Sequence, residues 1–303
     1  MKTILGSAGF AKIYSTVFST VVFVLLISFV PWSHLSSIST NFQWRRDLVH
    51  LYSAFRLYLG DHVFNTALIG KDGWIFFTAG KSIQDYQKTD LLKEERLEFL
   101  QSELRQLSVD LEKRGITLLV VIPPDKSTIY PQYMPDEIPV IGEKSRLDQF
   151  IEQIRLGGET NIIDLRPALL AASQNQEVYF KVDTHWNDLG AYYGYYEILS
   201  FLSRFDARLT PHPLSDYEYT YRGDWINPDL PLVLGIPSLK EEQWILVPKF
   251  RVQETQTMKL ELANDADILR TIGEDDSLPR LLAFHDSALP FLTGKWIKGD
   301  QNV

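Results

Sequence analysis

The amino-acid sequence predicts an α/β fold built on a doubly wound, mainly parallel sheet. From Leu97 to Leu199, short apolar runs alternate with longer segments of helical periodicity, the order that produces parallel strands covered by helices on both faces. The run ITLLVVIPP, Ile116 to Pro124, is almost entirely apolar and lies between Gly115 and a Pro-Pro pair. This pattern is typical of a strand buried on both faces.

Composition excludes several classes of function. The chain has 303 residues, of which 45% are hydrophobic, enough for one large domain or two small ones with a substantial core. Its formal charge is -9, and no cluster of Lys or Arg offsets it, which argues against a nucleic-acid partner. There is no cysteine, so disulfides, Cys nucleophiles and thiolate zinc sites are excluded.

The N-terminal region predicts a membrane anchor. Ile13–Trp32 contains no charged residue and is nearly long enough, as a helix, to cross a bilayer core of about 30 Å. Lys2 and Lys12 precede this run, which places the N-terminus in the cytoplasm and the rest of the chain outside. The alternative is a cleaved secretory signal, but the following VPWSHLSS lacks a small-x-small cleavage site. Both interpretations export the domain.

Three segments are therefore expected. Residues 1–32 form the cytoplasmic N-terminus and the signal anchor, 33–41 form a polar linker, and 42–303 form the extracytoplasmic domain. Within the domain, residues 206–278 are rich in Pro, Gly and Trp and alternate only weakly, which indicates an insertion or a peripheral β segment.

The elements before the central strand follow from local signals. Phe42–Leu59 predicts a helix. Ala67–Phe77 predicts a hairpin, because apolar runs flank Asp72 and Gly73, a strong turn signal. Leucines from Leu97 to Leu111 recur at three- and four-residue spacing, which predicts an amphipathic helix covering a sheet.

The elements after the central strand continue the alternation. A helix is expected over Ser145–Arg155, a strand over Asn161–Leu165 and, after a further helical stretch, another strand over Val178–Val182. The next helix has Asn187 or Asp188 as its N-cap. The last expected strand is Arg280–Phe284.

The pair Asp183 and His185 is the first candidate for catalysis. A carboxylate that accepts the imidazole Nδ1–H fixes the tautomer and stabilises the imidazolium formed when Nε2 takes a proton. Loops between a strand end and a helix start are where open α/β sheets place their sites. A structural histidine with a hydrogen-bonded neighbour is the simpler alternative for so short a motif. No further closely spaced ligand completes a zinc site, so no metal is predicted.

Ser287 is the second candidate, since it directly follows the last expected strand. A hydroxyl at such a turn can attack an acyl group with backbone N–H groups around its oxyanion. The alternative is a helix N-cap, a role that Asp286 could also fill, and no G-x-S-x-G motif is present. If both strand ends lie on one sheet edge, the chain carries a triad in the order Asp, His, Ser.

The segment after the central strand offers candidate substrate contacts. Lys126 and Tyr130 follow the end of that strand and are predicted to line the same cleft. The four prolines between Pro123 and Pro135 indicate, as the alternative, a rigid connecting loop.

Four segments resemble the AlgX/AlgJ-type SGNH hydrolase-like family of alginate and polysaccharide O-acetyltransferases. They are KDGWIFF, VVIPPDKSTIYPQYMP, YFKVDTHWNDLGAYYGY and AFHDSALPFL. The resemblance extends from about Ala67 to the C-terminus and implies a circularly permuted SGNH domain. It implies that Ser287 is the nucleophile, His185 the base and Asp183 the orienting carboxylate. Trp186 matches the family motif as a substrate-binding residue, with packing as its alternative role.

The resemblance also implies a function and a setting. An extracytoplasmic enzyme, single-pass in the inner membrane with its domain in the periplasm, would move acetyl groups onto hydroxyls of an alginate-like exopolysaccharide. It would need no cofactor, and a membrane protein would supply the acetyl groups. The alternatives are an acetylesterase and a non-catalytic polysaccharide-binding component. Ala288, where the family has Phe, and the short continuation to Val303 favour the last and indicate a truncated or degenerate C-terminus.

Overall fold

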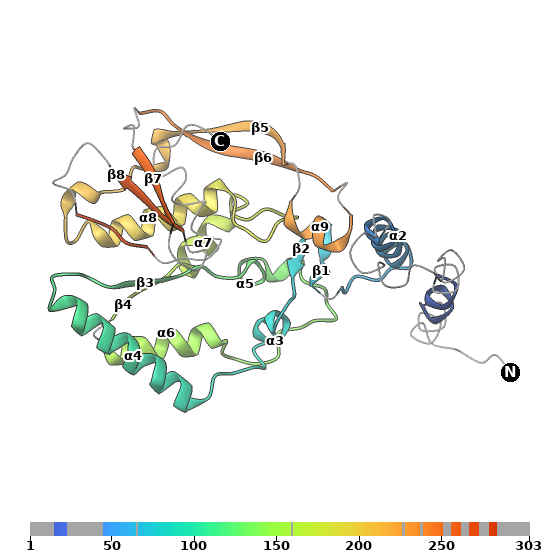
Figure 1. Ribbon diagram of the computed structural model, residues 1–303, viewed down its shortest axis with the longest axis horizontal. Coiled ribbons are helices and arrows are strands. Elements are labelled where there is room, and N and C mark those ends of the chain that lie inside the picture. Colours follow the sequence, from blue (N-terminus) through green and yellow to red (C-terminus); the bar gives the residue numbers. More distant parts are fainter. Residues whose placement is uncertain are drawn as a thin grey trace. The chain divides into compact units, whose positions relative to one another are not determined.

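Figure 1 shows the computed structural model of the protein. It describes residues 15–22, 45–64, 66–158, 160–225, 228–236, 239–250, 256–261, 267–272 and 279–283. These residues fall into two units. One lies within Met1–His62 and Leu234–Ile236, and the other lies within Val63–Val233 and Pro237–Val303.

The smaller unit contains the described part of the expected anchor. Residues 15–22 are helical, and α2 covers Arg45–Tyr58, as the helical prediction for this region required. Phe18 stacks on Phe55 with ring centroids 4.8 Å apart. Among the described residues, no helix combines the length and the apolar character needed to cross a bilayer. The other residues of Ile13–Trp32 lie outside the described part of the chain.

The larger unit begins with the expected hairpin. Strands β1 (Ala67–Ile69) and β2 (Ile75–Phe77) pair in antiparallel register around a 3-10 turn. Asp72 and Gly73 in this turn have φ values of 52° and 80°, and glycine and aspartate tolerate this left-handed region better than most residues. The Asp-Gly signal therefore located this turn correctly.

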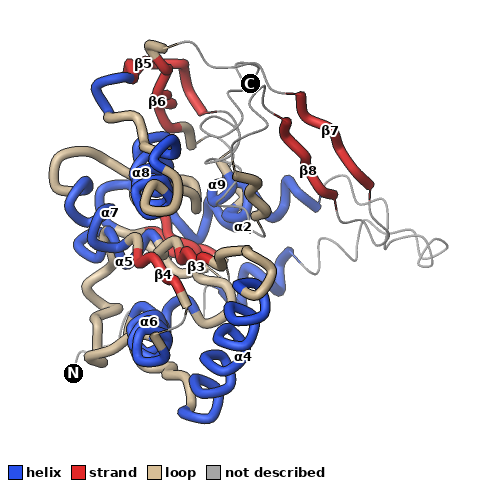
Figure 2. The backbone as a smooth tube through the Cα atoms, turned by 90° about the vertical axis from the view of Figure 1, so that its left-hand side faces the viewer, coloured by secondary structure: helices blue, strands red, loops and turns tan. Residues whose placement is uncertain are grey.

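A parallel strand pair with helices on both sides forms the α/β part of the unit (Figures 1 and 2). Strand β3 (Leu119–Ile122) pairs with β4 (Asn161–Asp164). Helices α4 (Glu94–Glu112) and α6 (Arg146–Gly157) pack together on one side of this pair. Helices α7 (Arg166–Ser173) and α8 (Asp188–Leu202) pack together on the other. The predicted helix–strand alternation is present, although Leu107 of α4 is exposed rather than packed on a sheet.

The extended, mainly parallel sheet is not found among the described residues. There, β3 and β4 are the one parallel pair, and the other three sheets are antiparallel. The strand expected over Val178–Val182 does not form. The N–H groups of Lys181 and Val182 bind the Glu241 carboxylate, and a backbone bond, from the Ile75 N–H of β2 to the Lys181 carbonyl at 2.9 Å, connects the segment to a described strand. Residues 279–283 are exposed and unpaired with any described strand, so this part of the expected strand Arg280–Phe284 is also wrong. Phe284 lies outside the described residues.

The segment expected to be peripheral contains two antiparallel strand pairs. Strands β5 (Tyr217–Trp225) and β6 (Glu241–Pro248) flank the short helix α9 (Asp229–Leu234). Strands β7 (Gln256–Glu261) and β8 (Asp267–Ile272) form the second pair. The β5–β6 pair is integral to the fold, since Tyr217 and Leu246 are buried in the main hydrophobic core. The short helices of the unit are α3 (Ser82–Tyr86), α5 (Lys126–Ile129), η3 (Pro131–Tyr133), η4 (Ala207–Leu209) and η5 (Leu214–Asp216).

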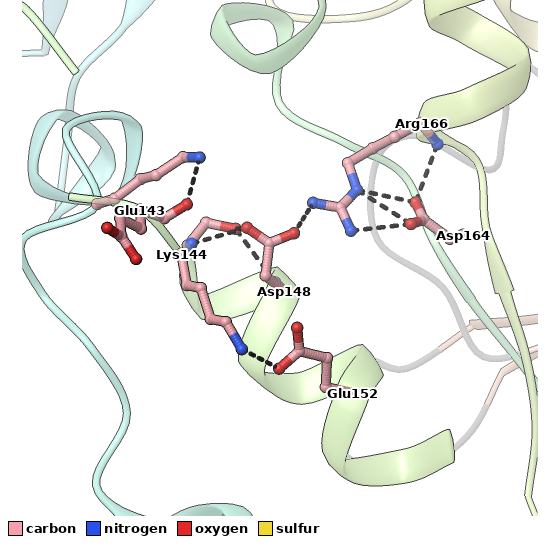
Figure 3. Close-up of polar contacts among 8 residues, drawn as sticks. Glu143, Lys144, Asp148, Glu152, Asp164 and Arg166 are labelled. Atoms are coloured by element: carbon pink, nitrogen blue, oxygen red, sulfur yellow. Dashed lines mark hydrogen bonds and ion pairs between the residues drawn. The ribbon is translucent and has the colours of Figure 1, made fainter. Parts of the chain in front are cut away.

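An ionic cluster ties α6 to the end of β4 (Figure 3). Ser145 and Asp148 form a capping box that starts α6. The guanidinium of Arg166 binds Asp148 Oδ1 at 2.5 Å and Asp164 Oδ2 at 2.8 Å. All three charged side chains are largely buried, so their mutual pairing offsets the cost of removing them from water.

Candidate active site

The Asp183–His185 segment is a closed turn between α7 and α8. An antiparallel bridge joins Tyr179 to Trp186, and the Phe180 N–H donates to the carbonyl of His185 at 3.3 Å. These bonds close the base of the turn, so the six residues Phe180–His185 project as one unit.

Asn187 fixes the turn to the start of α8. Its Oδ1 accepts from the N–H groups of Leu189 and Gly190 as the helix N-cap. Its Nδ2 donates to the carbonyl of Glu177 at 2.6 Å. A Cβ at Gly190 would lie 2.1 Å from the Val178 carbonyl oxygen, so the close approach of turn and helix requires glycine at this position.

Asp183 and His185 form the predicted pair. Asp183 Oδ1 lies 2.7 Å from His185 Nδ1 and also accepts the backbone N–H of His185 at 3.0 Å. Because an ionised carboxylate can only accept, the imidazole proton lies on Nδ1, and Nε2 of the neutral ring is a proton acceptor. This is the tautomer that a general base requires.

The environment keeps Asp183 ionised. Its side chain is only 5% exposed, and burial alone would raise the pKa of the carboxyl. Hydrogen bonds from the His185 ring and from the backbone N–H groups of Asp229 and His185 outweigh burial and hold the pKa of Asp183 below its ordinary value. The pair is therefore an imidazole beside a permanent negative charge at neutral pH.

Lys126 binds the turn from one side. This residue is 5% exposed, and its ammonium donates to the carbonyls of Phe180, Lys181 and Asp183 at 3.0, 3.0 and 2.8 Å. Burial lowers the pKa of Lys126 to about 7, although the carboxylates of Glu241, Asp183 and Asp229 act in the opposite direction. With all three ammonium protons donated to the turn, Lys126 organises the site from within the protein.

Two carboxylates bind the turn's N–H groups. Glu241, at the start of β6, accepts from the N–H groups of Lys181 and Val182 at 2.7 and 3.0 Å. Asp229, the first residue of α9, accepts the Thr184 N–H at 2.9 Å and the Thr184 hydroxyl. Side chains thus satisfy the N–H groups of Lys181, Val182 and Thr184, while the Lys181 carbonyl also accepts the backbone N–H of Ile75 in β2.

A cavity of about 180 Å³ lies beside the turn. Six of the residues that line it are Phe76, Phe77, Tyr179, Thr184, His185 and Trp186. Since a water molecule occupies about 30 Å³ of liquid, the volume is sufficient for an acetyl group. The His185 side chain is 22% exposed, so the imidazole borders a small space whose walls are aromatic on one part and polar on another, the latter including Ser82, Asp125 and Ser127.

The predicted substrate-contact residues differ in position. Trp186 lines the cavity, but it is 2% exposed, and its indole nitrogen has no hydrogen-bond partner in the described part of the chain. Lys126 also lines the cavity while its ammonium binds the turn. Tyr130 is in the core, where its hydroxyl accepts the Val178 N–H at 2.8 Å and its ring packs on Trp74. Burial raises the pKa of Tyr130 to about 12.

The predicted nucleophile, Ser287, lies outside the described residues together with Asp286 and Ala288. The structure therefore brings Asp183, His185, Trp186 and Lys126 together, and the assignment of Ser287 as the third triad member stays a prediction.

Asp183, His185 and Asp229 also form the one cluster among the described residues whose spacing could hold a metal ion, with ligand atoms within 4.8 Å of one another. The third carboxylate comes from a distant segment, which is why sequence spacing did not predict the cluster. Each carboxylate oxygen already accepts a hydrogen bond from the protein. A metal would have to displace these bonds, so the donor set fits a hydrogen-bonded dyad better.

Sequence reasoning missed Asp229 and Glu241. Both belong to the segment 206–278, which lacks regular periodicity, and no local motif connects either residue with Asp183. Only the path of β6 and α9 back to the turn brings them to the site.

Comparison with known proteins identifies the family. Residues 67–225, just over half of the chain, match the SGNH hydrolase-like domain of acetyltransferase AlgX. The probable alginate O-acetylase AlgJ of Pseudomonas aeruginosa is 31% identical over 124 residues, which cover 41% of this chain and 30% of that protein. The corresponding protein of Pseudomonas syringae is 36% identical over 81 residues, covering 27% and 20%. These alignments thus span less than a third of each relative.

Solved structures give similar matches. The O-acetyltransferase domain of Pseudomonas putida AlgJ has a TM-score of 0.41 at 20% identity, covering 59% of this chain and 63% of that one. Pseudomonas aeruginosa AlgX has a TM-score of 0.43 at 18% identity, covering 71% and 46%. On the strength of the family match, which contains both Asp183 and His185, the chain belongs to the AlgX family of SGNH hydrolase-like domains.

Proposed function

We propose that this protein is an O-acetyltransferase that moves acetyl groups onto hydroxyls of an alginate-like exopolysaccharide. The observation that carries the proposal is the 2.7 Å bond between Asp183 and His185 at the wall of a small cavity, within a domain of the AlgX family. The names of the relatives support the same chemistry, since three of them are probable alginate O-acetylases.

The proposed reaction has two halves that use the same residues. Ser287 Oγ attacks the carbonyl of the acetyl donor while His185 Nε2 takes the hydroxyl proton, and Asp183 stabilises the imidazolium. The donor's leaving group departs with that proton, and an acetyl-serine remains. A sugar hydroxyl then gives its proton to His185 and attacks the acetyl-serine. As the bond to Ser287 Oγ breaks, His185 returns that proton to Oγ, which releases the acetylated sugar and restores both Ser287 and the neutral imidazole. The backbone N–H of Ser287 contributes to the oxyanion hole in both halves.

The proposal includes an extracytoplasmic site of action. The uncharged run Ile13–Trp32 after Lys2 and Lys12 supports a signal anchor with the domain in the periplasm. In this setting, a membrane protein of the polysaccharide machinery supplies the acetyl groups, and the order Asp, His, Ser matches a circularly permuted SGNH domain. A phosphatase reporter fused after residue 303 should be active, and an inactive but expressed fusion would contradict export.

Incubation of the purified chain with an activated acetyl ester, with and without an alginate oligosaccharide, tests the function. Acetylated sugar formed by the parent but not by Ser287→Ala supports transfer. Equal hydrolysis with and without sugar, and no acetylated product, would identify an acetylesterase. If Ser287→Ala is as active as an active parent, Ser287 is not the nucleophile and the proposed mechanism fails. If neither the parent nor the variant acetylates or hydrolyses, a non-catalytic polysaccharide-binding role replaces both enzymatic functions.

A further inference from the structure

Asp229 contacts the Asp183–His185 turn at three points, although it lies 44 positions after His185 and outside the matched family region. Its backbone N–H donates to Asp183 Oδ2 at 3.0 Å. Its carboxylate accepts both the N–H and the hydroxyl of Thr184, the residue between the two members of the pair. Both oxygens of the Asp183 carboxylate are therefore bound, Oδ1 by His185 and Oδ2 by Asp229.

The two oxygens of the Asp183 carboxylate have different partners. Oδ2 is directed to the N–H of Asp229, which leaves Oδ1 for the ring and backbone N–H groups of His185. A carboxylate held by opposite hydrogen bonds cannot rotate without losing one of them. The plane of Asp183, and with it the plane of the imidazole, is therefore set by the start of α9.

Asp229 also places a second negative charge beside the ring. Its Oδ2 lies 4.0 Å from His185 Nδ1, and the Thr184 hydroxyl, which donates to that oxygen, lies 3.3 Å from the same nitrogen. A carboxylate at this distance favours the protonated imidazole. The other charged groups that bind the turn are Asp183 itself, Lys126 from α5 and Glu241 from β6.

We propose that Asp229 is a positioning residue for the Asp183–His185 pair, which it orients through Thr184 and the Asp183 carboxylate and whose imidazolium its charge stabilises. This inference rests on the proposed acyl transfer by His185. It assigns a function to a side chain from a segment that resembles an irregular insertion in the sequence.

Two substitutions separate orientation from charge. Asp229→Asn keeps an oxygen for the Thr184 N–H and removes the charge, whereas Asp229→Ala removes both and leaves the backbone N–H to Asp183 in place. The matched control is Asp224→Asn, an exposed aspartate of β5 that pairs with Lys240 and does not contact the turn. Circular dichroism and thermal melting verify that each full-length variant is folded.

The readout is the pH profile of kcat/KM for hydrolysis of p-nitrophenyl acetate. We expect Asp229→Asn to move the acidic limb toward lower pH by about one unit, a tenfold change in proton affinity. We expect Asp229→Ala to lower kcat on the plateau by about 10- to 100-fold, the usual effect of removing a residue that orients a functional ligand. Asp224→Asn should match the parent.

Two results would overturn the inference. If both Asp229 variants keep the parental profile and kcat while His185→Ala is inactive, Asp229 has no positioning role, although the proposed chemistry stands. If His185→Ala is itself fully active, the proposed function fails first. Should Asp229→Ala not fold, the displacement of the acidic limb in Asp229→Asn still decides the question.

Discussion

Lys126 and Glu241 bind the same turn, Lys126 through the backbone carbonyl groups of the turn and Glu241 through its backbone N–H groups. The Lys126 ammonium binds three carbonyl groups, and the Glu241 carboxylate binds two N–H groups of the intervening backbone. The two residues come from α5 and β6, far apart in the chain. A segment with an apolar, strand-like sequence is thus held as a turn by one buried and one half-buried charge, and this arrangement presents His185 to the cavity.

The buried lysine makes stability depend on pH. The pKa of Lys126 is lowered from 10.5 to about 7 in the folded protein. Between these values the unfolded chain binds a proton that the folded chain has released, so stability should rise with pH by up to about 1.4 kcal/mol per unit. Lys126→Met lacks this titration. In guanidinium unfolding from pH 7 to pH 10, the stability of the parent relative to this variant should increase. Parallel curves of stability against pH for the parent and Lys126→Met would contradict a lowered pKa of Lys126.

Removal of the base should abolish most turnover. We expect His185→Ala and Asp183→Asn each to lower kcat/KM for an acetyl ester by about 10²- to 10⁴-fold, because proton transfer by a positioned base contributes this much. His212 supplies a matched control, since it also pairs with an aspartate, Asp216, at 3.2 Å. That pair is exposed and does not line the cavity, so His212→Ala should leave the rate unchanged. An equal loss of kcat/KM in His185→Ala and His212→Ala would indicate a general effect on folding.

Chelation tests whether the cluster of Asp183, His185 and Asp229 holds a metal ion. Since the oxygens of Asp183 and Asp229 accept hydrogen bonds from the protein, we expect dialysis against EDTA to leave esterase activity unchanged. The measurement is the rate before and after dialysis, with metal content determined on the same sample. A loss that added zinc restores would instead make the cluster a metal centre.

Substitution of Tyr130 tests whether this residue stabilises the core or contacts the substrate. Tyr130→Phe removes the acceptor of the buried Val178 N–H, which should lower the free energy of unfolding by about 1–3 kcal/mol. Because Tyr130 does not line the cavity, KM should not change. Tyr133→Phe is the control, since Tyr133 also stacks on Trp74 but is less buried, and it should alter stability by no more than about 0.5 kcal/mol. A raised KM with full stability would assign Tyr130 to the substrate site.

Features encoded by neighbouring residues were predictable from the sequence. The turn at Asp72 and Gly73, the N-cap at Asn187 and the pairing of Asp183 with His185 each depend on residues a few positions apart. The family resemblance was likewise confirmed by the match over residues 67–225.

Features that depend on distant partners were not predictable. The apolar segment Val178–Val182 has the composition of a strand, but the charged side chains of Lys126 and Glu241 bind carbonyl and N–H groups that a strand ladder would use. No local pattern reports this competition, because the two side chains are separated from the segment by more than fifty positions. For the same reason, Asp229 gave no signal in the sequence.

The position of Asn187 couples the mobility of the site to the integrity of a helix. One amide side chain caps α8 and holds the carbonyl of Glu177 before the turn. Opening the turn therefore breaks the same contacts as fraying the first turn of α8, and the two events form one cooperative unit of local unfolding. The backbone amides of the turn and those of the first turn of α8 should therefore exchange hydrogen with solvent with the same free energy of opening. The rigidity of His185 then depends on the stability of α8.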